Sequence, residues 1–91
     1  MKYKLKTEVE TEVEIELPYY FKLTNNVISN SYFAILNKNK GISNWRCEDI
    51  VVNQYPPAIA SLIDSPGFEE ISKEEFKISL TQTFNNILNL I

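Results

Sequence analysis

Residues 2–17 have the sequence KYKLKTEVETEVEIEL, in which two classes of residue alternate. Every even position is Lys or Glu, whereas the odd positions carry Tyr, Leu, Val, Ile or Thr. Successive side chains of a β-strand point to opposite faces, so this period of two predicts a strand with one apolar and one charged face. A helix is excluded because its longer period would scatter the charges around the axis.

This stretch is expected to form a single long strand over residues 3–17. No Gly, Asn or Asp interrupts it, so its residues give no sign of a hairpin turn. A straight strand of this length would span about 50 Å, whereas a compact domain of this chain length has a diameter of roughly 30 Å. The strand is therefore expected to bend, bulge or protrude.

Three further strands are expected after Pro18, which cannot donate a hydrogen bond to a sheet. They cover 19–24, 31–37 and about 42–52, with a turn at Asn25-Asn26 and a tight hairpin at 38–41. Gly41 is expected to supply a positive φ in that hairpin. The last strand alternates poorly between polar and apolar residues, which indicates a bulge.

The remaining residues predict helices. The pair Pro56-Pro57 favours a short helical segment over 58–64, and Pro66-Gly67 fits a type II turn. Ser72 followed by Glu75 is the signature of a capping box at a helix start. The apolar stripe of this last helix is expected to lie on the apolar face of the sheet: Phe76, Leu80, Thr83, Phe84, Ile87 and Ile91.

The expected fold class is therefore α+β, in one domain over residues 1–91. A small antiparallel β-sheet of about four strands, the first one long, would be packed by a C-terminal amphipathic helix. With 91 residues and 44% hydrophobic residues, the chain can build a core without disulfides or metal.

Composition excludes several function classes. The chain has no His, one Cys and two Gly, so the usual general base, metal clusters and Gly-rich phosphate loops are missing. A net charge of −3 disfavours nucleic-acid binding. No signal peptide or membrane-spanning run is recognisable, and a lone Cys47 fits a reducing compartment. We expect a cytoplasmic protein that needs no cofactor and no metal.

The charged face of residues 2–16 allows two interpretations. The simpler one is a solvated outer face with intramolecular pairing only. The other is a homodimer in which two copies of the strand pair antiparallel, placing each Lys opposite a Glu of the other copy. The self-association residues would then be Lys2, Lys4, Lys6, Glu10, Glu12 and Glu14.

Trp45, Arg46 and Tyr55 are candidate binding residues because Trp, Tyr and Arg dominate binding hot spots. The alternative is that they pack in the core or at its edge. Cys47 is interpreted as a buried structural residue, because a nucleophilic thiol needs a base or cation that lowers its pKa and the chain has no His.

Lys38, Lys40 and Arg46 form the one basic cluster away from the N-terminus. With nearby aromatic rings they could hold a phosphate or a nucleotide, although lysines at an exposed hairpin tip also serve solubility. The acidic residues that precede and begin the last helix lack calcium-loop spacing and are interpreted as helix-capping charges: Glu69, Glu70, Glu74 and Glu75.

The segment GFEEISKEEF at residues 67–76 resembles the C-terminal part of many small uncharacterised proteins from gut-bacterial genomes and their phages. The residues YFAI at 32–35 are similar in a looser way. The resemblance implies a phage or mobile-element accessory protein, and it implies no activity and no functional residue.

Two functional hypotheses follow. The leading one is a non-enzymatic interaction module that binds a protein partner and its own copies, since catalytic parts are missing while a long charged strand is present. The other is a small-ligand or nucleotide-binding protein, a sponge or sensor, that uses Lys38, Lys40, Arg46 and aromatic stacking. An enzyme is not expected, because no carboxylate, lysine or tyrosine has a recognisable catalytic spacing.

Overall fold

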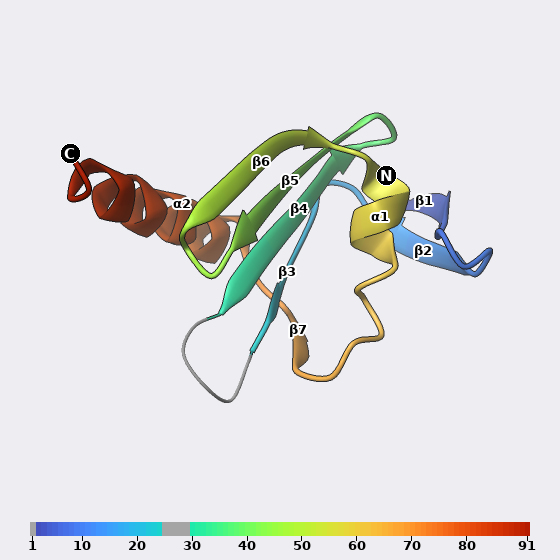
Figure 1. Ribbon diagram of the computed structural model, residues 1–91. Helices are drawn as coiled ribbons and strands as arrows, with labels where there is room; N and C mark the ends of the chain where they lie inside the picture. Colours follow the sequence, from blue (N-terminus) through green and yellow to red (C-terminus); the bar gives the residue numbers. More distant parts are fainter. Residues whose placement is uncertain (1, 25–29) are drawn as a thin grey trace.

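The computed structural model describes residues 2–24 and 30–91, which form seven strands and two helices (Figure 1). The α+β class is confirmed, but the strands are more numerous and shorter than predicted. One antiparallel sheet has the order β6-β5-β4-β3-β7, and β1 and β2 form a separate hairpin. The strands are β1 (Lys2–Lys6), β2 (Glu12–Glu16), β3 (Tyr19–Leu23), β4 (Ser31–Asn37), β5 (Lys40–Trp45), β6 (Asp49–Gln54) and β7 (Phe68–Glu70). The helices are α1 (Pro56–Ala60) and α2 (Lys73–Leu88).

The N-terminal stretch turns back on itself, so the prediction of one strand over residues 3–17 was wrong. The Thr7 N–H donates to the Thr11 carbonyl at 2.7 Å, and the Glu10 N–H donates to the Thr7 carbonyl at 3.0 Å. Glu10 has a φ of 64°, which a three-residue hairpin loop requires after its type I turn. Gly normally occupies this position, so a sequence with Glu there gives no sign of the turn.

The hairpin also changes what the charged face does. Across its two strands Lys2 lies opposite Glu16, Lys4 opposite Glu14 and Lys6 opposite Glu12, all within one chain. Glu10 lies in the loop instead of pairing. The intermolecular register built on Lys2, Lys4, Lys6, Glu10, Glu12 and Glu14 assumed a continuous strand, and this premise fails.

The expected return strand over 42–52 is likewise two strands, β5 and β6, joined by a turn. Arg46 and Cys47 both have a φ of 55°, and the Glu48 N–H donates to the Trp45 carbonyl at 2.9 Å. The expected bulge is present, because the β5–β6 register shifts at Gly41/Ile42, opposite Asn53 with a φ of 65°. The predicted turn at Asn25-Asn26 lies outside the described residues.

The main core lies on one face of the five-stranded sheet, here called the first face. The β1–β2 hairpin and α1 cover this face, and the buried cluster comprises Leu5, Ile15, Phe21, Phe33, Ile35, Ile59 and Ala60. Gly41 lies in β5 below α1, where an added Cβ would collide with Cδ1 of Ile59. Gly41 is therefore required for close approach of α1, and the expectation of a positive φ was wrong.

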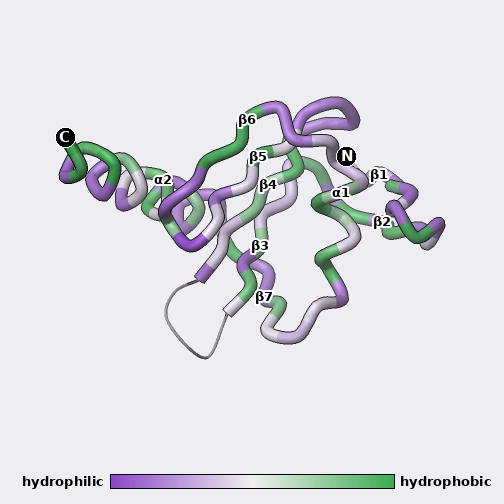
Figure 2. The backbone as a smooth tube through the Cα atoms, viewed as in Figure 1, coloured by the Kyte–Doolittle hydropathy of each residue, from purple (hydrophilic) through white to green (hydrophobic). Residues whose placement is uncertain are grey.

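Helix α2 lies on the opposite, second face. Its predicted start is confirmed, because the Glu75 N–H donates to Ser72 Oγ at 3.1 Å. Only the first part of its apolar stripe reaches the sheet: Phe76 and Thr83 are buried, whereas Phe84 and Ile91 are exposed. The reason is that α2 crosses the sheet and projects past β6 (Figure 1), while hydrophobic residues recur to the C-terminus (Figure 2).

The short turn between the helices agrees with the sequence. The Phe68 N–H donates to the Ser65 carbonyl at 3.2 Å, and Gly67 has a φ of 84°, as a type II turn after Pro66 requires. Within residues 2–24 and 30–91, no helix combines the length and hydropathy needed to cross a membrane.

Candidate functional site

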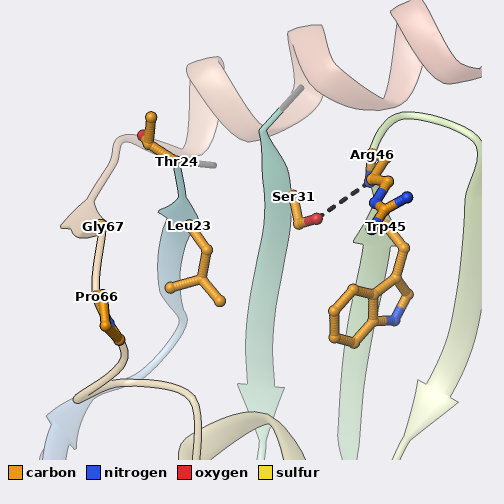
Figure 3. Close-up of a pocket in the computed structure, with 7 residues that line it drawn as sticks. All are labelled: Leu23, Thr24, Ser31, Trp45, Arg46, Pro66 and Gly67. Atoms are coloured by element: carbon orange, nitrogen blue, oxygen red, sulfur yellow. Dashed lines mark hydrogen bonds between the residues drawn. The ribbon is translucent and has the colours of Figure 1, made fainter. Parts of the chain in front are cut away.

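A pocket of about 400 Å³ opens on the first face of the sheet, next to the β5–β6 turn (Figure 3). The end of β3, the start of β4, the end of β5 and the turn before β7 supply its walls. The residues that line it are Leu23, Thr24, Ser31, Trp45, Arg46, Pro66 and Gly67.

Trp45 forms the apolar wall of this pocket. Its ring packs edge-on against Phe33, with centroids 5.0 Å apart and planes at 83°. Phe33 is fully buried, yet Trp45 is 41% exposed, so one side of the indole belongs to the core and another faces solvent. Both interpretations of Trp45, core edge and accessible aromatic surface, therefore describe part of this side chain.

Arg46 lies beside Trp45 at the pocket rim. Its backbone N–H donates to Ser31 Oγ at 3.1 Å, which ties the β5–β6 turn to the start of β4 (Figure 3). In the part of the chain that the structure describes, the exposed Arg46 side chain forms no ion pair. Its positive φ is unfavourable for a residue with a side chain, by roughly 1–2 kcal/mol. The fold thus holds the guanidinium of Arg46 next to an open aromatic surface, without an ion-pair partner among residues 2–24 and 30–91.

The other basic candidates lie elsewhere. Lys38 and Lys40 occupy the β4–β5 connection, at the opposite end of β5 from Arg46. Arg46 lies six positions after Lys40 along an extended chain, which corresponds to about 20 Å. The structure therefore does not bring the three cations together. Tyr55, 65% exposed, precedes α1 at the Lys40 end, so the candidate binding residues divide into two groups.

Cys47 is 5% exposed, which confirms the expected burial. Its carbonyl accepts a hydrogen bond from Asn86 Nδ2 at 3.1 Å, which links the β5–β6 turn to α2. Among the residues that the structure describes, no three His, Cys, Asp or Glu side chains are arranged to hold a metal ion.

Two of the acidic residues around the α2 start form ion pairs. Lys22 Nζ in β3 lies 3.1 Å from Glu75 Oε2 and 3.6 Å from Glu69 Oε2. The hydrogen bond to Glu75, together with both negative charges, raises the pKa of Lys22 above its ordinary value. These carboxylates therefore fasten α2 and β7 to β3, in addition to the favourable position of Glu75 in the first turn of the helix.

Sequence reasoning identified Trp45 and Arg46 but not the residues that complete their pocket. Ser31, Leu23 and Pro66 come from strands and turns far apart in the chain, and their types are ordinary for such positions. One signal was available: a Trp-Arg pair beside a poorly alternating strand segment. No family model, curated protein or solved structure matches this chain.

Proposed function

We propose that this protein is a non-enzymatic interaction module that binds a protein partner through the pocket at Trp45 and Arg46. The observation that carries the proposal is the half-open indole of Trp45 beside the guanidinium of Arg46, which forms no ion pair with any residue that the structure describes. Trp and Arg are the residue types that contribute most often to binding hot spots. A phage or mobile-element role stays a prediction based on resemblance.

The chemistry of the pocket favours one kind of partner segment. Trp45 and Leu23 offer apolar surface, while Arg46 offers donors that match a carboxylate in a bidentate geometry. The preferred segment would place an aromatic or aliphatic side chain against the indole and a neighbouring Asp or Glu against the guanidinium.

Nucleotide binding is the second candidate, with one cation near Trp45 in place of the three that the sequence suggested. With Lys38 and Lys40 at the far end of β5, a nucleotide could use only stacking on Trp45 and one charge from Arg46. A single cation gives a weaker phosphate site than the three that the sequence suggested.

The sole Trp of the chain makes the test direct, because its fluorescence reports from the pocket. Short peptides that combine aromatic and acidic residues should shift Trp45 emission on titration. Matched peptides with Asn and Gln in place of Asp and Glu should bind about tenfold more weakly, since a hydrogen bond to a charged group contributes about 1.5–3 kcal/mol.

Variants separate the two candidates. Arg46→Gln should weaken peptide binding by a similar factor, whereas Lys38→Gln, at the far end of β5, should leave it unchanged. A response to mononucleotides without any response to peptides would favour the second candidate. Emission that no peptide alters would contradict the proposed function.

A further inference from the structure

Strand β6 forms one edge of the five-stranded sheet and pairs with β5 alone among the strands that the structure describes. In an antiparallel pair, every second residue directs its N–H and C=O groups away from the partner strand. No backbone hydrogen bond joins residues 49–54 to a part of the described chain other than β5. The outer side of β6 therefore presents backbone donors and acceptors, which are the groups that pair with another extended chain.

The protection of this edge is limited to one end of β6. Proteins commonly block an edge strand with Lys, Pro or a bulge. The sequence DIVVNQ of β6 contains neither Lys nor Pro, and its bulge lies at Asn53, which has a φ of 65°. Before the bulge, Val51 is 42% exposed and Val52 is 58% exposed. Residues 49–52 therefore form a regular and largely apolar edge.

Helix α2 crosses the sheet and continues past β6 (Figure 1). The Phe76 ring contacts Tyr20 of β3, and Thr83 Oγ1 donates to Asn44 Oδ1 of β5 at 2.9 Å. Seven residues of helix, about 10 Å, thus cover two strand spacings, also about 10 Å, so α2 runs almost perpendicular to the strands. Leu90 follows Thr83 by another seven residues, just beyond the end of α2, which places it about one strand spacing past β6.

A cavity of about 450 Å³ lies between this end of α2 and the start of β6. The residues that line it are Glu48, Asp49, Asn86, Ile87 and Leu90. Ile87 follows the buried Thr83 by about one helical turn, so it continues the sheet-facing side of α2. Leu90 is 85% exposed. The end of α2 therefore extends its apolar side over a position next to β6 that no strand of the described chain occupies.

We infer that an extended segment of a protein partner adds to β6 as a further strand beneath the end of α2. Its backbone pairs with the outer side of β6, and every second side chain packs against Ile87 and Leu90. Such a strand supplies both kinds of contact that this edge offers, the backbone hydrogen bonds and the apolar cover.

The charges of the cavity define the other side chains of the segment. Glu48 and Asp49 line the cavity, and no Lys or Arg of the described chain does. Opposite charges on neighbouring strands are favourable, so the segment alternates apolar residues with Lys or Arg. Self-pairing of β6 fits less well, because the one charge in this strand is that of Asp49 and a second β6 supplies no cation.

NMR of the ¹⁵N-labelled protein with an eight-residue peptide of alternating Val and Lys tests the inference. Amide shifts should centre on β6 and the end of α2, and hydrogen exchange of the outward amides of residues 49–52 should slow at least tenfold at saturation. The same peptide with N-methyl groups on alternate residues keeps its side chains but loses its backbone donors. It should bind at least tenfold more weakly.

Two matched pairs of variants locate the contact. Leu90→Ser should weaken binding of the Val-Lys peptide about tenfold, because it removes an apolar side chain that the segment covers. Ile78→Ser, at an exposed position on the other side of α2, should leave binding unchanged. Asp49→Asn should weaken binding about two- to fivefold, whereas Asp64→Asn, exposed and outside the cavity, should not. Arg46→Gln should not weaken it either, which separates this edge from the pocket at Trp45.

Four outcomes would overturn the inference. One is equal binding of the N-methylated peptide, and another is a set of shifts confined to α2. The third is equal or tighter binding of a peptide with Glu in place of Lys, or no shift at about 1 mM of the Val-Lys peptide. The fourth is a shift of the β6 amides with protein concentration in the absence of peptide, which would assign the edge to a second copy.

Discussion

Glu10 illustrates how single residues conceal the turns of this protein. Glu10, Arg46, Cys47 and Asn53 all have positive φ values, in the region where a side chain is unfavourable. Three of the four lie in turns and one at a bulge. Sequence reasoning finds such places through Gly, and also through Asn and Asp, so the two turns built with Glu, Arg and Cys could not be predicted.

Replacing Glu10 by Gly should therefore stabilise the protein. Gly adopts a positive φ without the steric cost that Glu10 has, which adds about 1–2 kcal/mol to the free energy of unfolding. The greater conformational freedom of Gly in the unfolded chain offsets roughly 0.5–1 kcal/mol of this gain. The net gain of about 0.5–1 kcal/mol corresponds to a few degrees in Tm, measurable by thermal denaturation.

Glu8→Gly is the control for this variant, because it removes the same charge from the same loop at a position without positive φ. It should leave the Tm unchanged or lower it. Equal Tm gains for both substitutions would show that charge, and not backbone conformation, limits this loop.

At the scale of elements, α2 is held on the sheet by a polar network as well as by apolar contact. Asn44 is fully buried, its Nδ2 donates to the Ser79 carbonyl at 3.2 Å, and its Oδ1 accepts from Thr83 Oγ1 at 2.9 Å. Phe76 adds a ring contact to Tyr20 at 5.5 Å. Buried polar groups must be paired, so this network fixes the position of α2 along the strands.

Removing the Asn44 side chain should loosen α2 and destabilise the fold. Asn44→Ala leaves Thr83 Oγ1 and the Ser79 groups with one partner fewer in a buried site, a loss of about 1–3 kcal/mol. Urea denaturation measures the stability, and amide hydrogen exchange should show the protection lost most strongly in α2.

Asn85→Ala, at an exposed position of the same helix, should be close to neutral in both measurements. If Asn44→Ala lowered stability with exchange accelerated evenly over all strands and α2, the network would be a general core feature and not the anchor of this helix.

Elements whose signals are local were the ones the sequence predicted correctly. The bounds of β4 match the expected 31–37, and Ser72 caps α2 as expected. The face that α2 covers depends on long-range contacts. Asn44 forms hydrogen bonds with Ser79 and Thr83, which lie 35 and 39 positions later in the chain. An apolar stripe in the sequence cannot reveal such a polar attachment. The pocket likewise combines residues that lie far apart in the sequence.

At the scale of the whole molecule, β3 connects the parts that lie on both sides of the sheet. Phe21 enters the main core, Lys22 pairs with Glu75 of α2 and Glu69 of β7, and Tyr19 lies beside Glu70 of β7. Burial and then the Glu70 carboxylate raise the pKa of Tyr19 to about 12. Burial and the charge of Glu74 also raise the pKa of Tyr20. The protonation of Tyr19, Tyr20 and Lys22 in this strand therefore affects the stability of the whole fold.

Stability should fall as the pH rises above 10. Below that value Tyr19 is protonated in the folded and the unfolded chain, and its contribution is complete. Between pH 10 and about 12 the unfolded chain releases the Tyr19 proton while the folded chain retains it, so the free energy of unfolding decreases. The raised pKa of Lys22 acts in the same direction. Urea denaturation at about pH 8, 10 and 11 measures the fall. Tyr19→Phe should reduce it, whereas Tyr55→Phe, at an exposed site, should follow the wild type; identical profiles for Tyr19→Phe and the wild type would exclude Tyr19 as its cause.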